Sequence, residues 1–117
     1  MNVYENFFCL APHAKERPRV TKHGTYMPEA YKKWRKSFCL LSNPPKEPIP
    51  GSVQVGIHIQ TESGRMRPDL DNAAGAILDA LQDAGVIEND KMVSGLHASI
   101  KKSDRPGIWV TVSIAEQ

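Results

Sequence analysis

The chain has 117 residues, of which 40% are hydrophobic and 24% charged, and its formal net charge is +2. This length accommodates one domain with one hydrophobic core, and the ordinary composition excludes a fibrous or low-complexity protein. No apolar run approaches the roughly 20 residues that span a bilayer. The N-terminal segment carries an acidic residue ahead of its short apolar stretch, which is the wrong order for a secretory signal. We therefore expect a cytoplasmic protein in which Cys9 and Cys39 stay reduced.

The first residues of the chain predict a strand and a hairpin. Residues 3–11 are rich in β-forming side chains and end at Pro12, which is typical of a strand. Two short extended runs flank His23 and Gly24, and they indicate a hairpin or an ordered basic loop within residues 17–28.

A helix is predicted over residues 29–41, because apolar side chains recur there at helical spacing. Pro28 stands where a helix can start, since the first turn leaves its N–H groups unpaired in any case. The apolar stripe, which we expect in the core, consists of Tyr31, Trp34, Phe38 and Leu41. The four prolines and the glycine of residues 42–51 then require a loop.

The remaining chain predicts a strand, a helix and two further strands. Residues 52–61 alternate between apolar and polar side chains, as in a half-buried strand. A helix is expected over residues 71–84, with Gly85 as its stop, and two strands over residues 92–101 and 107–115. The order β–(β-hairpin)–α–β–α–β–β predicts an α+β domain, with two main helices packed on a mixed β-sheet.

Charge is distributed unevenly along the chain. Residues 13–46 hold nine Lys and Arg against two Glu, whereas residues 62–90 hold seven acidic residues against two Arg. The basic half of the chain could bind a polyanion such as DNA, and the acidic half could hold metal cations. A nuclease needs both. Solvated helix faces produce the same separation, so the pattern alone leaves both interpretations open.

The most informative segment is RMRPDLDN, residues 65–72. Asp69 and Asp71 stand two residues apart, and side chains at this spacing in an extended stretch point the same way. Either Asp71 or Asn72 alone could instead cap the following helix. Two neighbouring carboxylates repel each other, and a hard cation such as Mg²⁺ relieves the repulsion. In phosphodiester hydrolysis such an ion activates water and stabilises the leaving oxygen.

A third acid would complete this site, and Asp90 in the ENDK segment is our candidate. A short turn after Gly85 could return the chain beside the start of the helix or across the sheet from it. Glu88 is the competing candidate. Asp79 and Asp83 lie within the predicted helix, and we expect them to be solvated or structural groups.

The runs ERPRVTKHGTYMP and RPDLDNAAGAILDALQDAGVIENDKMV together resemble the RusA family of Holliday-junction resolvases over most of the chain. The resemblance implies a single RusA-like endonuclease domain over residues 1–117, of a phage- and prophage-associated group acting in DNA recombination and repair. It implies a homodimer that resolves four-way junctions by paired symmetric nicks with Mg²⁺, for which Mn²⁺ can substitute. By position, it assigns metal binding and catalysis to Asp69, Asp71 and Asp90.

One departure from the family concerns Gly75. The family commonly has a lysine at this place, which could polarise the scissile phosphate, and Lys91 or Lys101 are the substitutes that we consider. The glycine leaves open a branched-DNA-binding protein with a weakened or decayed catalytic site. A third hypothesis is a magnesium enzyme acting on a small phosphorylated metabolite, and the lack of a Gly-rich phosphate loop counts against it.

Several basic residues are candidates for DNA contact, because they stand on the stiff, proline-bearing segment near residue 18, lie close in sequence to Asp69 or Asp90, or, for Lys101, could extend the basic groove. They are Arg17, Arg19, Lys22, Arg65, Arg67, Lys91 and Lys101. For each, the alternative is a surface cation that serves solubility.

Overall fold

The structure is a computed structural model that describes residues 1–66 and 68–115. Its elements follow the predicted order, with one short 3₁₀ helix, η1, added before the last two strands. They are β1 (Asn2–Phe8), β2 (Arg19–Thr21), β3 (Gly24–Tyr26), α1 (Glu29–Leu41), β4 (Val53–Thr61), α2 (Leu70–Asp83), η1 (Asp90–Met92), β5 (Val93–Lys102) and β6 (Gly107–Ile114). The predicted α+β class is confirmed.

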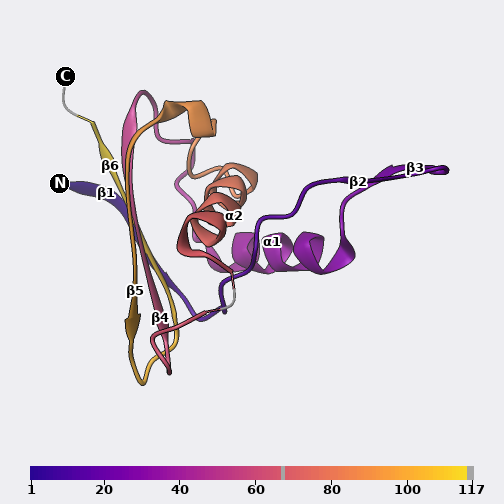
Figure 1. The fold of residues 1–117 in the computed structure, drawn as a ribbon. Helices are drawn as coiled ribbons and strands as arrows, with labels where there is room; N and C mark the ends of the chain where they lie inside the picture. Colours follow the sequence, from indigo (N-terminus) through magenta and orange to yellow (C-terminus); the bar gives the residue numbers. More distant parts are fainter. Residues whose placement is uncertain (67, 116–117) are drawn as a thin grey trace.

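Four strands form one mixed sheet in the order β1–β6–β4–β5. The β4–β5 pair is parallel, whereas β6 runs antiparallel to both of its neighbours. Parallel neighbours need a crossover connection, and α2 supplies it between β4 and β5. Both helices cover the same face of the sheet (Figure 1). The alternating residues of β4 that face this layer are buried, namely Val53, Val55, Ile57 and Ile59.

The apolar stripe of α1 packs between the sheet and α2. Tyr31, Trp34 and Phe38 are buried, and the ring of Phe38 stacks on Phe8 of β1 with centroids 3.9 Å apart. The prediction that Leu41 joins this core is wrong, because its side chain is 45% exposed. The helix ends at this residue beside the edge strand β1, where Leu41 presents its carbonyl to the Asn6 side-chain amide at 2.8 Å.

Strand β1 is shorter than predicted. It ends at Phe8 instead of continuing to residue 11, since its pairing with β6 stops at Ile108. The chain then turns toward α1, where the Trp34 indole N–H donates to the carbonyl of Ala11 at 2.7 Å. Cys9, just past the strand, is exposed, and Cys39 in α1 is half-buried; both are free thiols, as expected.

Strands β2 and β3 form a separate two-stranded hairpin, and all six of their residues are exposed. Figure 1 shows this hairpin projecting from the body of the molecule, away from the sheet. We call residues 17–26 the arm. The radius of gyration is 14.5 Å, whereas about 13 Å is expected for a compact chain of this length. The arm accounts for the elongated shape.

Within the described part of the chain, neither helix has the length and apolar character that crossing a bilayer requires.

Candidate active site

The DLDN segment forms the start of α2. Asp69 is the residue before the first helical position, with extended backbone angles of φ −62° and ψ 151°, and Asp71 lies in the first turn. Both side chains are exposed. The Asp69 carboxylate makes no capping hydrogen bond, and among the described residues neither carboxylate has a hydrogen-bond or ion-pair partner. Helix capping therefore leaves both carboxylates available to a ligand.

A hollow of about 330 Å³ opens beside Asp69. The loop before α2 forms one wall of it with Arg65 and Pro68, and Ile100 of β5 contributes from the sheet. The structure thus brings Arg65 and Asp69 to one concave surface. Asp71, which lies in the first helical turn and not in an extended stretch, is not among the described residues that line this hollow, so the expectation that both carboxylates face one cavity is met only by Asp69. Arg67, predicted like Arg65 to contact DNA, lies outside the described residues.

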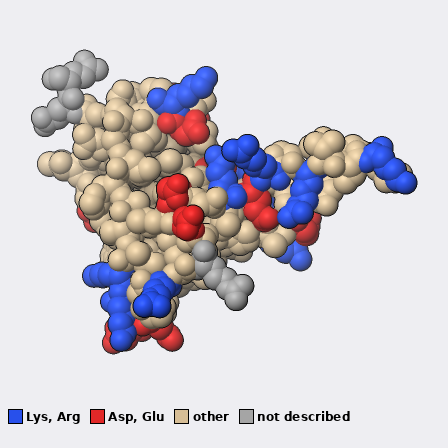
Figure 2. Space-filling view, in the orientation of Figure 1, with Lys and Arg blue, Asp and Glu red and all other residues tan. Residues whose placement is uncertain are grey.

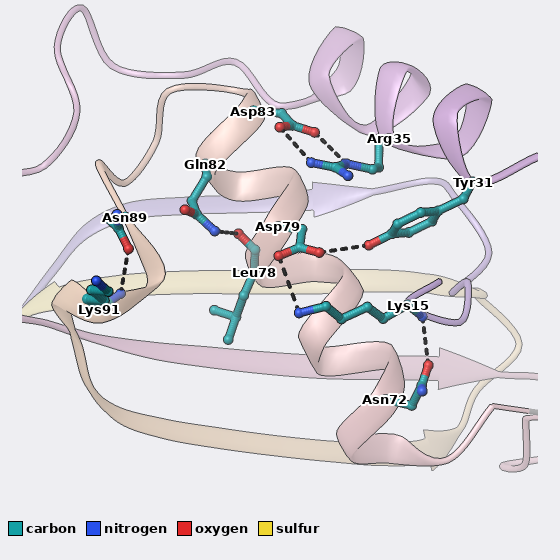
Figure 3. Close-up of polar contacts among 10 residues, drawn as sticks. All are labelled: Lys15, Tyr31, Arg35, Asn72, Leu78, Asp79, Gln82, Asp83, Asn89 and Lys91. Carbon is teal, nitrogen blue, oxygen red and sulfur yellow. Dashed lines mark hydrogen bonds and ion pairs between the residues drawn. The ribbon is translucent and has the colours of Figure 1, made fainter. Parts of the chain in front are cut away.

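Asp90 does not lie beside this pair within one chain. It begins η1, after α2 has run 14 residues, a rise of about 20 Å. Figure 3 shows Asn89 and Lys91, the neighbours of Asp90, beside the C-terminal half of α2, whereas Asn72 lies at its start. The turn after Gly85 therefore does not return the chain to the start of the helix.

The pairing of the sheet explains this separation. Val93 at the start of β5 lies opposite Val53 at the start of β4, so η1 must sit at the end of the sheet where β4 begins. The aspartate pair instead follows the end of β4. Within residues 1–66 and 68–115, no three His, Cys, Asp or Glu side chains are grouped closely enough to hold a metal ion together.

A magnesium ion nevertheless fits the Asp69–Asp71 pair. Mg²⁺ is usually bound through one or two carboxylates, with water and substrate phosphate oxygens completing its shell. Asp69 and Asp71 offer two exposed carboxylates at the start of α2, without partners among the described residues, and so meet that need.

The exposed face of α2 beyond Asp71 is crossed by Lys15, a contact that the sequence did not predict (Figure 3). Its backbone N–H donates to the Asn72 side-chain oxygen at 2.6 Å. Its stem passes over Gly75, where an added Cβ would lie 3.1 Å from Cδ of Lys15. Its ammonium is 3.6 Å from Asp79 Oδ1. The only sequence signal for this contact was a glycine in mid-helix.

Neither lysine considered as a substitute for the missing side chain at position 75 lies there. Lys91 belongs to η1, where its N–H donates to the side-chain oxygen of Asn89 at 2.9 Å. Lys101 is exposed on β5 opposite Gln60 of β4. The structure places Lys15 at Gly75 instead.

Asp79 and Asp83 are structural groups, as expected. The Tyr31 hydroxyl donates to Asp79 at 3.0 Å, and Arg35 donates two hydrogen bonds to Asp83 at 2.6 and 2.8 Å. Burial, reinforced by the bond to Asp79, raises the pKa of Tyr31 above its usual value. The hydrogen bonds to Asp83 raise the pKa of Arg35. These contacts join α1 to α2.

The predicted DNA-contact residues that the structure describes are all exposed. Arg17, Arg19 and Lys22 lie on the arm, and Arg19 is 3.7 Å from Glu16. Figure 2 shows Lys and Arg side chains along the arm and near its root, and again at the lower end of the body, with acidic side chains over the body between them.

Comparison with known protein families matches residues 10–113 to the family described as Endodeoxyribonuclease RusA. No curated protein sequence matches the chain. The family match spans nearly the whole chain, from the segment after β1 to the last strand, and includes both the arm and the DLDN helix start. RusA proteins are endodeoxyribonucleases that bind branched DNA and resolve Holliday junctions. The chain belongs to the RusA endodeoxyribonuclease family.

Proposed function

We propose that this protein is a structure-selective, magnesium-dependent endodeoxyribonuclease that resolves four-way DNA junctions by paired symmetric nicks. The observation that carries the proposal is the pair of exposed carboxylates, Asp69 and Asp71, at the start of α2 in a chain of the RusA family. Their lack of partners among the described residues suits a metal ligand better than a structural group.

The residues around this pair have separate roles in cleavage. Asp69 and Asp71 would hold Mg²⁺ (or Mn²⁺), and such an ion, when bound, would activate water and neutralise charge at the leaving oxygen. Arg65 lines the same hollow as Asp69 and grips the phosphate next to the cut. The unpaired N–H groups of the first turn of α2 favour an anion at the same place. A phosphodiester is thereby positioned over the two carboxylates.

The arm supplies the wider contact with DNA. Arg17, Arg19 and Lys22 are exposed on a hairpin that reaches beyond the body, so their charges can follow a phosphate backbone. Lys101 extends the basic surface along β5, and Arg67 and Lys91 complete the proposed set. Contacts of this kind set orientation on the junction without reading the base sequence.

We also propose that the active form is a homodimer, and that Asp90 joins the metal site only across the dimer. Asp90 is exposed but lies at the other end of α2 from Asp69 and Asp71. A second copy related by a two-fold axis can bring its own Asp90 to the pair, and the same contact then occurs twice. Two equivalent metal sites would suit the two equivalent DNA strands that are nicked in a four-way junction.

Nicking of a synthetic four-way junction tests the function. The junction and a linear duplex of the same sequence are incubated with the protein while the Mg²⁺ concentration is varied. We expect paired, metal-dependent nicks in the junction and an intact duplex. Equal cutting of both substrates would contradict structure selectivity, and no cutting in Mg²⁺ or Mn²⁺ would contradict the nuclease.

Gly75 favours a second candidate function, a protein that binds branched DNA but has a weakened or decayed catalytic site. This alternative expects junction binding that weakens steeply with salt, without nicking under any metal condition. Robust nicking by the wild type removes it.

A further inference from the structure

Lys15 is held against the start of α2 by its backbone and not by its charge. The Lys15 N–H donates to Asn72, which directly follows Asp71 in the chain, at 2.6 Å. This bond joins segments 57 positions apart. It fixes the root of the lysine side chain next to the proposed metal site, whatever its ammonium contacts.

The absence of a side chain at Gly75 leaves room for the aliphatic stem of Lys15 to cross the helix. A Cβ at this position would lie 3.1 Å from Cδ and 3.9 Å from Cβ of Lys15, and the shorter separation is tighter than ordinary van der Waals contact. Any side chain at position 75 would therefore displace the stem. Glycine in a helix interior is unfavourable, and here it leaves the space that Lys15 occupies.

The ammonium of Lys15 is only weakly held. It lies 3.6 Å from Asp79 Oδ1, and its side chain is 44% exposed. Exposed pairs at such separations contribute little to stability. Asp79 keeps the hydrogen bond from Tyr31 when the lysine leaves. The lysine can therefore move without stranding an unpaired buried charge.

We infer that Lys15 is a phosphate-contacting residue of the proposed nuclease, whose ammonium leaves Asp79 for the DNA phosphate beside Asp69 and Asp71 when a junction binds. The inference rests on the proposed function. Lysine binds phosphate as a mobile point charge on a flexible stem. A cation aimed at the scissile phosphate stabilises the charge that develops during cleavage. Lys15 is thus the lysine that Gly75 makes room for.

The test compares Lys15→Gln with Lys46→Ala, a control at an exposed lysine of the loop between α1 and β4. Glutamine keeps the stem over Gly75 and removes the charge. Single-turnover nicking should fall roughly ten- to a hundred-fold in Lys15→Gln, as expected for loss of one stabilising group. Junction binding in EDTA should lose about one unit of salt slope. The control should match the wild type in both measurements.

Two further variants separate contact with DNA from a structural role. Asp79→Asn removes the resting partner of Lys15 but still accepts from Tyr31, so nicking should persist; a loss equal to that of Lys15→Gln would overturn the inference. Gly75→Lys combined with Lys15→Ala should recover nicking over Lys15→Ala alone, because the cation returns from the helix itself.

The outcomes keep the inference distinct from the proposed function. Suppose that the wild type nicks junctions and that Lys15→Gln has the same nicking rate and salt slope. This result would overturn the role of Lys15 and leave the proposed nuclease activity standing. A wild type that binds but never nicks would overturn both. Thermal unfolding of each variant shows whether slower nicking reflects an unfolded protein. If Lys15→Gln is unfolded, the comparison of Lys15→Ala with Lys15→Ala/Gly75→Lys tests the inference instead.

Discussion

Val93 at the start of β5 lies directly opposite Val53 at the start of β4, in parallel register. This strand register separates Asp90 from the Asp69–Asp71 pair. Asp69 follows the end of β4, whereas Asp90 comes just before β5 begins, so the length of α2 lies between them. A single chain therefore presents these aspartates at two separate places, and we propose that a second copy brings them together.

A mixed dimer tests this arrangement. One Asp71→Asn chain is paired with one Asp90→Asn chain, and the heterodimer is purified through two different tags. If each site takes Asp71 from one copy and Asp90 from the other, one site of the heterodimer carries both substitutions and the other carries neither. The intact site should then nick one strand. Both mutant homodimers should be inert and serve as controls. An inert heterodimer would place each complete site within one chain, contrary to the proposal.

Asp71→Asn should keep junction binding while nicking in Mg²⁺ falls by roughly 10²-fold or more, the scale of loss when a stabilising group leaves an active site. Binding should persist because the basic groups of the arm are untouched. The measurement is single-turnover cleavage beside a gel-shift titration. Asp104→Asn, in the exposed turn before β6, is the control with wild-type rate. Undiminished nicking in Asp71→Asn would remove this residue from the site.

Arg17→Ala and Arg19→Ala should weaken junction binding and lower its salt slope by roughly one for each phosphate contact removed. The two side chains stand on the exposed arm, so the melting temperature should stay close to that of the wild type. Binding titrations over a series of salt concentrations give the slope. Lys46→Ala should leave it unchanged, and unchanged slopes in the arginine variants would exclude the arm from the DNA path.

Asp83→Asn should lower the free energy of unfolding by about 1 kcal/mol, because it weakens a two-point contact between helices. Arg35 reaches Asp83 through Nε and Nη2, at 2.6 and 2.8 Å. Urea unfolding at low and high salt measures the loss. Glu29→Gln is the matched control, since its contact with Lys32 is 3.7 Å long and exposed on both sides; equal losses in both variants would argue against the Asp83 contact.

Alkaline pH should destabilise the protein through two buried phenols. Burial raises the pKa of Tyr4 from 10.0 to about 12, and the pKa of Tyr31 is raised in the same direction. Stability from a raised pKa is complete below the unfolded value and is lost as pH rises through the folded one. The free energy of unfolding should therefore fall above pH 10. Tyr4→Phe should flatten that fall, and an unchanged slope would contradict this assignment.

Local patterns in the sequence predicted the elements well. The helix over residues 29–41 was predicted at its actual bounds, and β4 and α2 were each predicted within about one residue of their ends. Periodic burial and the terminating Gly85 are local signals, so neighbouring residues suffice to find them. Leu41 was misplaced because the periodic pattern does not show where the sheet edge lies.

The site depended on contacts that local patterns do not contain. Asp69 and Asp71 stand two residues apart in the sequence, so their common location at the start of α2 was predictable. Lys15 meets Asn72 across 57 positions, and no spacing rule connects them. The position of Asp90 follows from the strand register, which is set by the whole sheet rather than by the ENDK segment.

The arm is structurally independent of the packed body of the molecule. Among the described residues, its two strands pair only with each other, and all six of their residues are exposed. Trypsin should therefore cut the chain at Lys22 long before it opens the body. β1 would stay in the sheet through its pairing with β6. The nicked protein would keep a native core on two polypeptides, with the strand that bears Arg19 detached from its hairpin partner.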